Sequence, residues 1–155
     1  MAGATSGIRV DFDDSDIQQA LQKLSKIGGN MPAAMLEISE YLHERSRDHF
    51  DNEQSPDGTS WPTFSPEKIA AKEKQGVSIN KRLHGQTLNL RDTIFPFHSS
   101  SEAGVSTGPG TEAYAATQMF GDPDRNIEAS PFFGIAEQDE TEIIDIIHDY
   151  LARPL

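Results

Sequence analysis

"SPDGTSWPTFSP" at residues 55–66 contains the only tryptophan of the chain, Trp61, among prolines, serines and a glycine. These neighbours favour a compact loop and give no helical or strand periodicity that could carry the side chain into a core. Two interpretations of Trp61 follow. Its ring packs against the helix that precedes the loop, as a lid on a small core, or it enters a groove on a neighbouring subunit.

Before this loop the sequence predicts two amphipathic helices joined by a tight turn. The first is expected to be capped by Asp13, Asp14 or Ser15 and to end at the glycine pair 28–29. Its apolar residues recur at the i, i+3, i+4, i+7 spacing of one helical face: Ile17, Ala20, Leu21, Leu24 and Ile27. The second is expected to begin near Met31 and to run to Asp51, with Met35, Ile38, Leu42 and Phe50 on one side.

After the loop the pattern becomes mixed. Residues 66–76 read as a short basic helix, and residues 75–88 have no clear period and are expected to be mobile. The stretch "LNLRDTIFPFH" from Leu88 is rich in β-formers, and together with "AGVSTG" it predicts a β-hairpin over 91–107. A two-turn helix should follow between Thr111, as its cap, and Gly121. The last helix should start near Glu137.

These elements predict an α+β fold, with an N-terminal helical hairpin and a C-terminal helix packed on a small antiparallel sheet. We expect one domain over residues 1–155, with a Pro/Gly loop at 52–66. The C-terminal helix should face the core with Ile143, Ile146, Ile147, Tyr150 and Leu151. We expect Leu21, Leu24 and Leu42 among the neighbours of these residues.

Composition limits the functions that are open to the chain. Its 155 residues include no cysteine, which excludes disulfides, Cys-based zinc sites and thiol nucleophiles. No apolar run approaches the ~20 residues that span a bilayer, and the N-terminus does not read as a signal peptide. The formal net charge of −12 disfavours binding to nucleic acid or anionic lipid.

The charge is unevenly distributed along the chain. Between Glu67 and Asp92 only three acidic residues oppose six basic ones, which are Lys68, Lys72, Lys74, Lys81, Arg82 and Arg91. This region has two interpretations: a solvated helix face and loop, or a basic surface that complements an acidic surface of another subunit.

No catalytic, metal or cofactor site is expected from the sequence. His43 and His49 are six residues apart, on opposite sides of a helix, and are interpreted as surface histidines. The run "DFDDSD" lacks the glycine and the final glutamate of a calcium loop. Two alternatives stay open: a small metal-dependent hydrolase, which would need His84, His98 and an acid to converge, or a nucleic-acid-binding module that uses residues 68–91.

Four segments in order resemble one known family. They are "FDNEQSPDGTSWPTFSPEK" at 50–68, "LNLRDTI" at 88–94, "YAATQMFG" at 114–121 and "ASPFFG" at 129–134. Together they are similar to the phage virion morphogenesis family, the Mu G-like and P2 S-like tail completion proteins, over about residues 31–152. The chain departs from the family pattern at Thr87-Leu88, where Thr-Gly is usual, at Gln118, where His is usual, and at Glu128 and Ser130, where Pro and Arg are common.

The resemblance implies a non-enzymatic structural protein of a tailed phage, present in the host cytoplasm during assembly and in the virion at the neck or head-proximal tail end. It implies a homo-oligomeric ring, most simply a hexamer, whose partners are the tail tube or tail terminator and the head-tail connector, with no membrane, cofactor or sequence-specific nucleic acid. The residues expected at subunit or partner interfaces are Trp61, Lys68, Lys72, Lys74, Arg91, Tyr114, Phe120 and Phe132.

Overall fold

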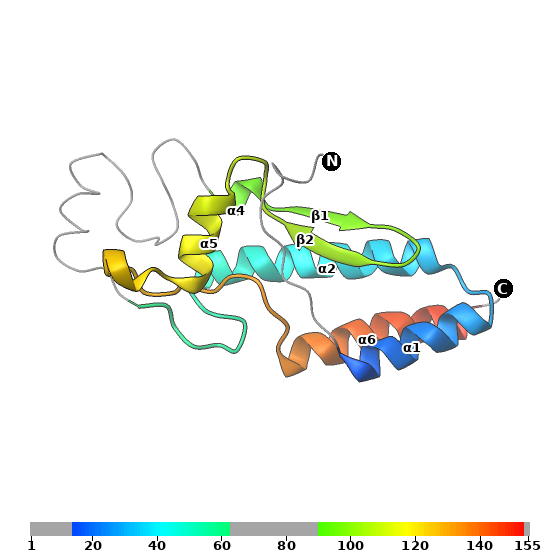
Figure 1. Cartoon of the computed structure of the whole chain (residues 1–155). Helices are drawn as coiled ribbons and strands as arrows, with labels where there is room; N and C mark the ends of the chain where they lie inside the picture. Colours follow the sequence, from blue (N-terminus) through cyan, green and yellow to red (C-terminus); the bar gives the residue numbers. More distant parts are fainter. Residues whose placement is uncertain (1–13, 63–89, 154–155) are drawn as a thin grey trace.

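The computed structural model describes residues 14–62 and 90–153. The helices among them are α1 (Ser15–Lys26), α2 (Met31–Asn52), α4 (Leu90–Thr93), α5 (Glu112–Phe120), the 3-10 turn η2 (Pro123–Arg125) and α6 (Glu137–Ala152). The strands are β1 (Phe95–His98) and β2 (Ala103–Ser106). The expected α+β class is confirmed (Figure 1). The predicted basic helix at 66–76 and the segment 75–88 lie outside the described residues.

Side-chain caps define the two N-terminal helices. Asp14 is the cap of α1, because its carboxylate accepts a hydrogen bond from the Ile17 N–H at 2.9 Å. Asn30 does the same for α2 by accepting from the Ala33 N–H at 3.2 Å. With 22 residues, α2 is about 33 Å long, which lets it contribute to packing at both ends of the molecule.

The hairpin is antiparallel, and its register pairs Phe95 with Ser106 and His98 with Ala103. It is shorter than the predicted range of 91–107, because residues 90–93 form the helical turn α4. Both Leu90 and Ile94 are buried. In a helical turn, residues four apart lie on one face and about 6 Å from each other. In a strand the same two residues would be about 13 Å apart, so they could not pack into one small core.

The later helices begin and end near the predicted positions, with one difference in capping. Thr111 occupies the N-cap position of α5 but makes no capping bond, because its hydroxyl donates to the Gly108 carbonyl at 2.6 Å. Gly121 follows the last residue of α5 with a positive φ of 77°. The helix α6 starts at Glu137, as expected.

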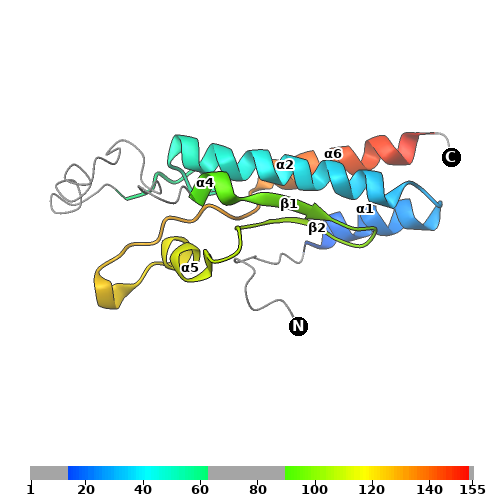
Figure 2. The ribbon, with the colours of Figure 1, turned by 90° about the horizontal axis from the view of Figure 1, so that it is seen from above.

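The elements are arranged around α2. Figures 1 and 2 show α1 and α6 side by side along one edge of the molecule, with α2 and the hairpin above them. Direct contacts join α1 to α6, and join α2 to both α6 and the hairpin. The other end of the molecule carries α5, η2 and the loop that follows α2 (Figure 2).

Two hydrophobic cores are formed along α2. The helical core lies between α1, α2 and α6 and contains Leu24, Met35, Ile143 and Ile147, all buried. The predicted inward stripe of α6 is confirmed, because Ile143, Ile147 and Tyr150 are buried in this core together with Leu24. The partly buried residues that pack against it include Ile146, Leu151, Leu21 and Leu42. The second, aromatic core was not predicted from the sequence. It contains Phe50, Trp61, Leu90, Ile94, Ala115, Met119, Phe132 and Phe133.

A buried carboxylate connects α6 to α2. Asp139 is fully buried and accepts hydrogen bonds from the Tyr41 hydroxyl at 2.6 Å, the Arg45 Nε at 2.7 Å and the Ala136 N–H at 2.9 Å. Burial by itself would raise the pKa of Asp139, but these three donors outweigh it and hold the pKa below its ordinary value. The side chain is therefore ionised at neutral pH and fully hydrogen-bonded.

We expect Asp139→Ala to lower the free energy of unfolding by about 3 kcal/mol, because it leaves the partly buried Arg45 and the Tyr41 hydroxyl without their acceptor. Urea denaturation at pH 7 measures this change. The matched control is Glu142→Ala, an exposed acid on the same helix, which should stay within about 0.5 kcal/mol of the parent. Equal effects of the two variants would contradict the role of the network.

Candidate functional site

The loop after α2 is fixed by its own backbone. Glu53 ends the helix in the left-handed conformation, with φ of 52°. Two backbone bonds of 2.8 Å then close the loop, from Ser55 N–H to the Thr59 carbonyl and from Trp61 N–H to the Glu53 carbonyl. Gly58 takes a φ of +91° at the tip, a conformation that glycine adopts without strain. The loop is therefore a compact unit that delivers Trp61 back to the end of α2.

Trp61 belongs to the aromatic core of its own chain. Its side chain is 5% exposed, and its ring meets Phe50 edge-on with 5.6 Å between ring centroids. The indole N–H donates to the Pro131 carbonyl at 2.8 Å, so the polar atom is also satisfied. Of the two interpretations of Trp61, the structure therefore agrees with packing inside its own chain.

His49 was predicted to lie on the surface, and this prediction is wrong. Its side chain is 4% exposed, and its Nδ1 lies 2.9 Å from the Phe132 carbonyl. A carbonyl only accepts, so Nδ1 carries the proton, and the other ring nitrogen is buried with no hydrogen-bond partner among the described residues. Burial, as the largest effect, lowers the pKa of His49.

The residues expected at interfaces fall into four groups. Trp61 and Phe132 are buried in the aromatic core, and Phe132 has no exposed surface. Arg91 makes a two-bond ion pair with Asp51, at 2.6 and 3.0 Å, which ties α4 to the end of α2. Tyr114 and Phe120 on α5 are exposed, to 37% and 66%. The three lysines 68, 72 and 74 lie outside the described residues.

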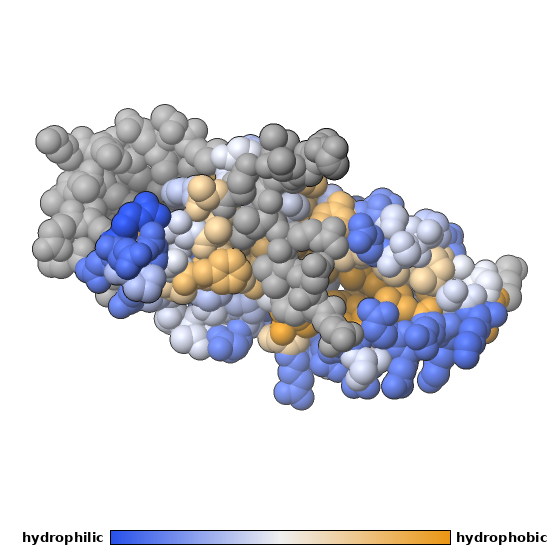
Figure 3. Space-filling model, viewed as in Figure 1, coloured by the Kyte–Doolittle hydropathy of each residue, from blue (hydrophilic) through white to orange (hydrophobic). Residues whose placement is uncertain are grey.

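Besides Tyr114 and Phe120, a third aromatic residue, Phe95, is exposed and was not singled out from the sequence. This residue of β1 is 42% exposed. Periodicity within a four-residue strand is too short to distinguish its outward face from its inward face. Space-filling atoms show apolar surface over the α5 end of the molecule in Figure 3.

Carboxylates cluster at one place in the described part of the chain. Ligand atoms of Asp14, Asp16 and Glu140 lie within 4.8 Å of one another. Hydrogen bonding and repulsion from Asp14, followed by Asp16, raise the pKa of Glu140. The preference of helix N-termini for acidic residues accounts for this arrangement, because the three acids lie at the starts of α1 and α6. His98 is exposed at the end of β1 and is not part of the cluster, and His84 lies outside the described residues.

Comparison with protein families gives a match to the phage virion morphogenesis family. The match covers residues 12–152 of the 155, a range that contains both cores and all described helices. The chain belongs to the phage virion morphogenesis family. Neither the curated proteins nor the solved structures gave a match.

As a phage virion morphogenesis protein, the chain has a role in virion assembly. None of the helices in the described ranges has the length and apolar character needed to cross a membrane. Two of its departures from the family pattern are neighbours in the structure. The backbone N–H of Ser130 donates to the Gln118 carbonyl at 2.6 Å, so this position is held by main-chain atoms whatever the side chains are.

We expect the stability of this virion morphogenesis protein to fall as the pH drops below 6.5, the ordinary pKa of histidine. Between that value and the lower pKa of folded His49, the unfolded chain binds more protons, so acid favours unfolding. Urea denaturation at pH 7.5 and 5.5 measures the difference in the free energy of unfolding.

The variant His49→Gln keeps an N–H donor for Phe132 and should show a smaller loss of stability between the two pH values. The matched control, His98→Gln, replaces an exposed histidine and should keep the parental pH dependence. A parental profile in His49→Gln would show that the buried imidazole does not control stability in this range.

Proposed function

We propose that the protein completes the tail of a tailed phage at the neck or head-proximal tail end, where it supports head-tail joining as a closed homo-oligomeric ring without catalysis. Family membership supports the assembly role. The position and the number of six subunits rest on the resemblance to tail completion proteins. The proposed partners are the tail tube or tail terminator and the head-tail connector.

The observation that carries this proposal is the position of the residues that flank the basic segment in the sequence. Trp61 and Leu90, on either side of it, are both buried in the aromatic core. These two flanking residues are thus held at one end of the molecule. Helix α5, which carries the exposed Tyr114 and Phe120, packs on the same core through Ala115 and Met119.

An acidic surface is available at a different place. The helix α6 has six acidic residues and no lysine or arginine. Glu142, Asp145 and Asp149 are exposed at helical spacing on its outer face. In a ring each subunit uses two different patches, so a basic segment of one chain can meet the acidic α6 face of the next.

Exposed Phe120 should contribute to this contact between subunits. We expect Phe120→Ser to shift the purified protein toward monomer with the melting temperature unchanged, because a side chain that is 66% exposed contributes little to folding. Native mass measurement gives the oligomer distribution. Leu36→Ser, an exposed apolar residue on α2, is the matched control and should assemble normally. Loss of assembly in both variants would contradict a specific role of Phe120 at the interface.

Charge reversal tests the ring contact and the function together. Lys68, Lys72 and Lys74 changed to glutamate should weaken assembly and leave heads and tails unjoined, with the monomer still folded. Changing Glu142, Asp145 and Asp149 to lysine in the same chain should restore assembly and infectious particles. Restoration identifies the two patches as partners.

Two outcomes would count against the proposal. Normal assembly by the lysine triple variant would exclude the charge mechanism. Normal joining of heads to tails in the complete absence of the protein would exclude the function itself, independently of how subunits contact each other.

A further inference from the structure

His49 uses one of its two ring nitrogens and leaves the other without a partner. Its Nδ1–H donates to the Phe132 carbonyl at 2.9 Å, whereas the buried Nε2 has no hydrogen-bond partner among the described residues. The two nitrogens of an imidazole face in different directions, so Nε2 is directed away from Phe132. When the ring takes up a proton, Nε2–H becomes a donor. A buried cation with a donor that lacks an acceptor is unfavourable, so the charged ring favours another position.

A polar pocket of about 510 Å³ borders the His49 ring, where the end of α2, the loop after it and the start of α6 meet. Its ionisable residues are His49 itself, Arg45 and three exposed acids, which are Asp48, Asp57 and Glu137. Arg45 is held by the buried Asp139 at 2.7 Å and lies 3.9 Å from Asp48. The polar pocket therefore offers acceptors to a positively charged ring.

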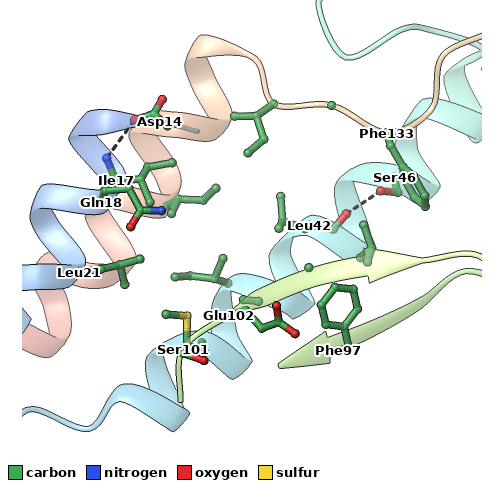
Figure 4. Close-up of a pocket in the computed structure, with 18 residues that line it drawn as sticks. Asp14, Ile17, Gln18, Leu21, Leu42, Ser46, Phe97, Ser101, Glu102 and Phe133 are labelled. Carbon is green, nitrogen blue, oxygen red and sulfur yellow. Dashed lines mark hydrogen bonds between the residues drawn. The ribbon is translucent and has the colours of Figure 1, made fainter. Parts of the chain in front are cut away.

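One face of α2 forms a wall of the polar pocket. Arg45, His49 and Asn52 all line it, and residues spaced by three or four positions are neighbours on a helix surface. A change of the His49 rotamer therefore carries the ring from the Phe132 carbonyl toward the pocket. Figure 4 shows a different pocket, in which apolar side chains such as Leu42 and Phe133 converge between α1, α2 and the hairpin. Of these two pockets, His49 borders the polar one.

The surroundings of the ring determine when it becomes charged. Burial is the largest effect and lowers the pKa of His49, and Arg45 lowers it further. The bond to the Phe132 carbonyl and the charges of Asp139 and Asp48 act in the opposite direction. Asp139 itself has a pKa below its ordinary value of 3.8, so it stays ionised in mild acid and continues to bind Arg45.

We propose that His49 is a proton-driven switch: the charged ring leaves the Phe132 carbonyl, turns into the polar pocket and pairs with the carboxylates there. The step adds one proton and breaks no covalent bond. The segment 131–133 then loses one of its two side-chain anchors, and the aromatic core opens. The helical core, which does not contain His49, stays folded. The switch is independent of the proposed function.

Acid favours the open form for a reason of sign. In the closed form the pKa of His49 lies below its ordinary value of 6.5, whereas the ring in the open form is close to solvent and to acids. Between the two values the open form binds a proton that the closed form does not. The population of the open form therefore rises about tenfold for each unit by which the pH falls.

Trp61 is the only tryptophan of the chain, so its fluorescence reports on the aromatic core alone. Far-UV circular dichroism reports on the helices. In an acid titration of the full-length chain from pH 7.5 to 4.5, the Trp61 emission should shift to longer wavelength before the helical signal changes. His49→Gln cannot take up the proton and should lack this early shift. His98→Gln, which changes an exposed histidine, should keep it.

The destination of the ring is tested by the pocket variant Asp48→Asn, Asp57→Asn, Glu137→Gln. Without the three carboxylates the open form is less favourable, so the midpoint of the Trp61 shift should fall by about half a pH unit or more. The matched control removes three exposed acids from the outer face of α6 and should keep the parental midpoint: Glu142→Gln, Asp145→Asn, Asp149→Asn.

Three results would overturn the switch. The first is a Trp61 shift that coincides with the loss of helical signal, which means global unfolding. The second is an early shift that persists in His49→Gln. The third is a midpoint that the pocket variant and its control change equally. If His49→Gln does not fold, the pocket variant decides alone, because its three substitutions are all at exposed positions.

Discussion

Two side-chain hydrogen bonds hold the extended segment before α6 against the end of α2, and the second core depends on them. The segment at 131–133 has no regular secondary structure, so its carbonyl groups need partners when they are buried. Trp61 donates to Pro131, and His49 donates to Phe132. These bonds place the Phe132 ring 5.0 Å from the Phe50 ring, between centroids. The main-chain bond from Ser130 N–H to the Gln118 carbonyl holds the residue just before this segment.

The helix α2 joins this aromatic core to the helical core. Its first half contributes Met35 and Ile38 to the helical core, and Phe50 near its end contributes to the aromatic one. Between them, Arg45 and Tyr41 reach the buried carboxylate of Asp139 at the start of α6. An ion pair of this kind contributes little net stability compared with apolar packing, but it penalises any other position of α6 along α2. The long helix thus fixes the relative position of both ends.

Local patterns were sufficient to predict most of the elements, though not α4 or η2, because helical spacing and turn residues are properties of short windows. The inward stripe of α6, the caps at Asp14 and Gly121 and the hairpin follow from them. The aromatic core could not be predicted in this way, since Trp61 and Pro131 are 70 residues apart and no periodicity links them. For the same reason His49 was wrongly predicted to lie on the surface, and the burial of Asp139 was not predicted. Each is polar and lies in a helix that has a polar face, and only the distant Phe132 carbonyl, Tyr41 and Arg45 make its burial favourable.

The buried position of Trp61 also changes how an interface in this protein can form. Trp61 and Phe132 are already used in the core, so the proposed contacts between subunits would depend on groups attached to that core. The aromatic core contains Ala115 and Met119 of α5 together with Trp61 and Leu90, which flank the basic segment in the sequence. Rigid presentation would matter in the proposed ring, because every subunit would repeat the same contact and small angular errors would add up before closure. Trp61 and Phe132, which the sequence suggests as interface residues, therefore have an indirect role. They fix the positions of the residues that remain exposed.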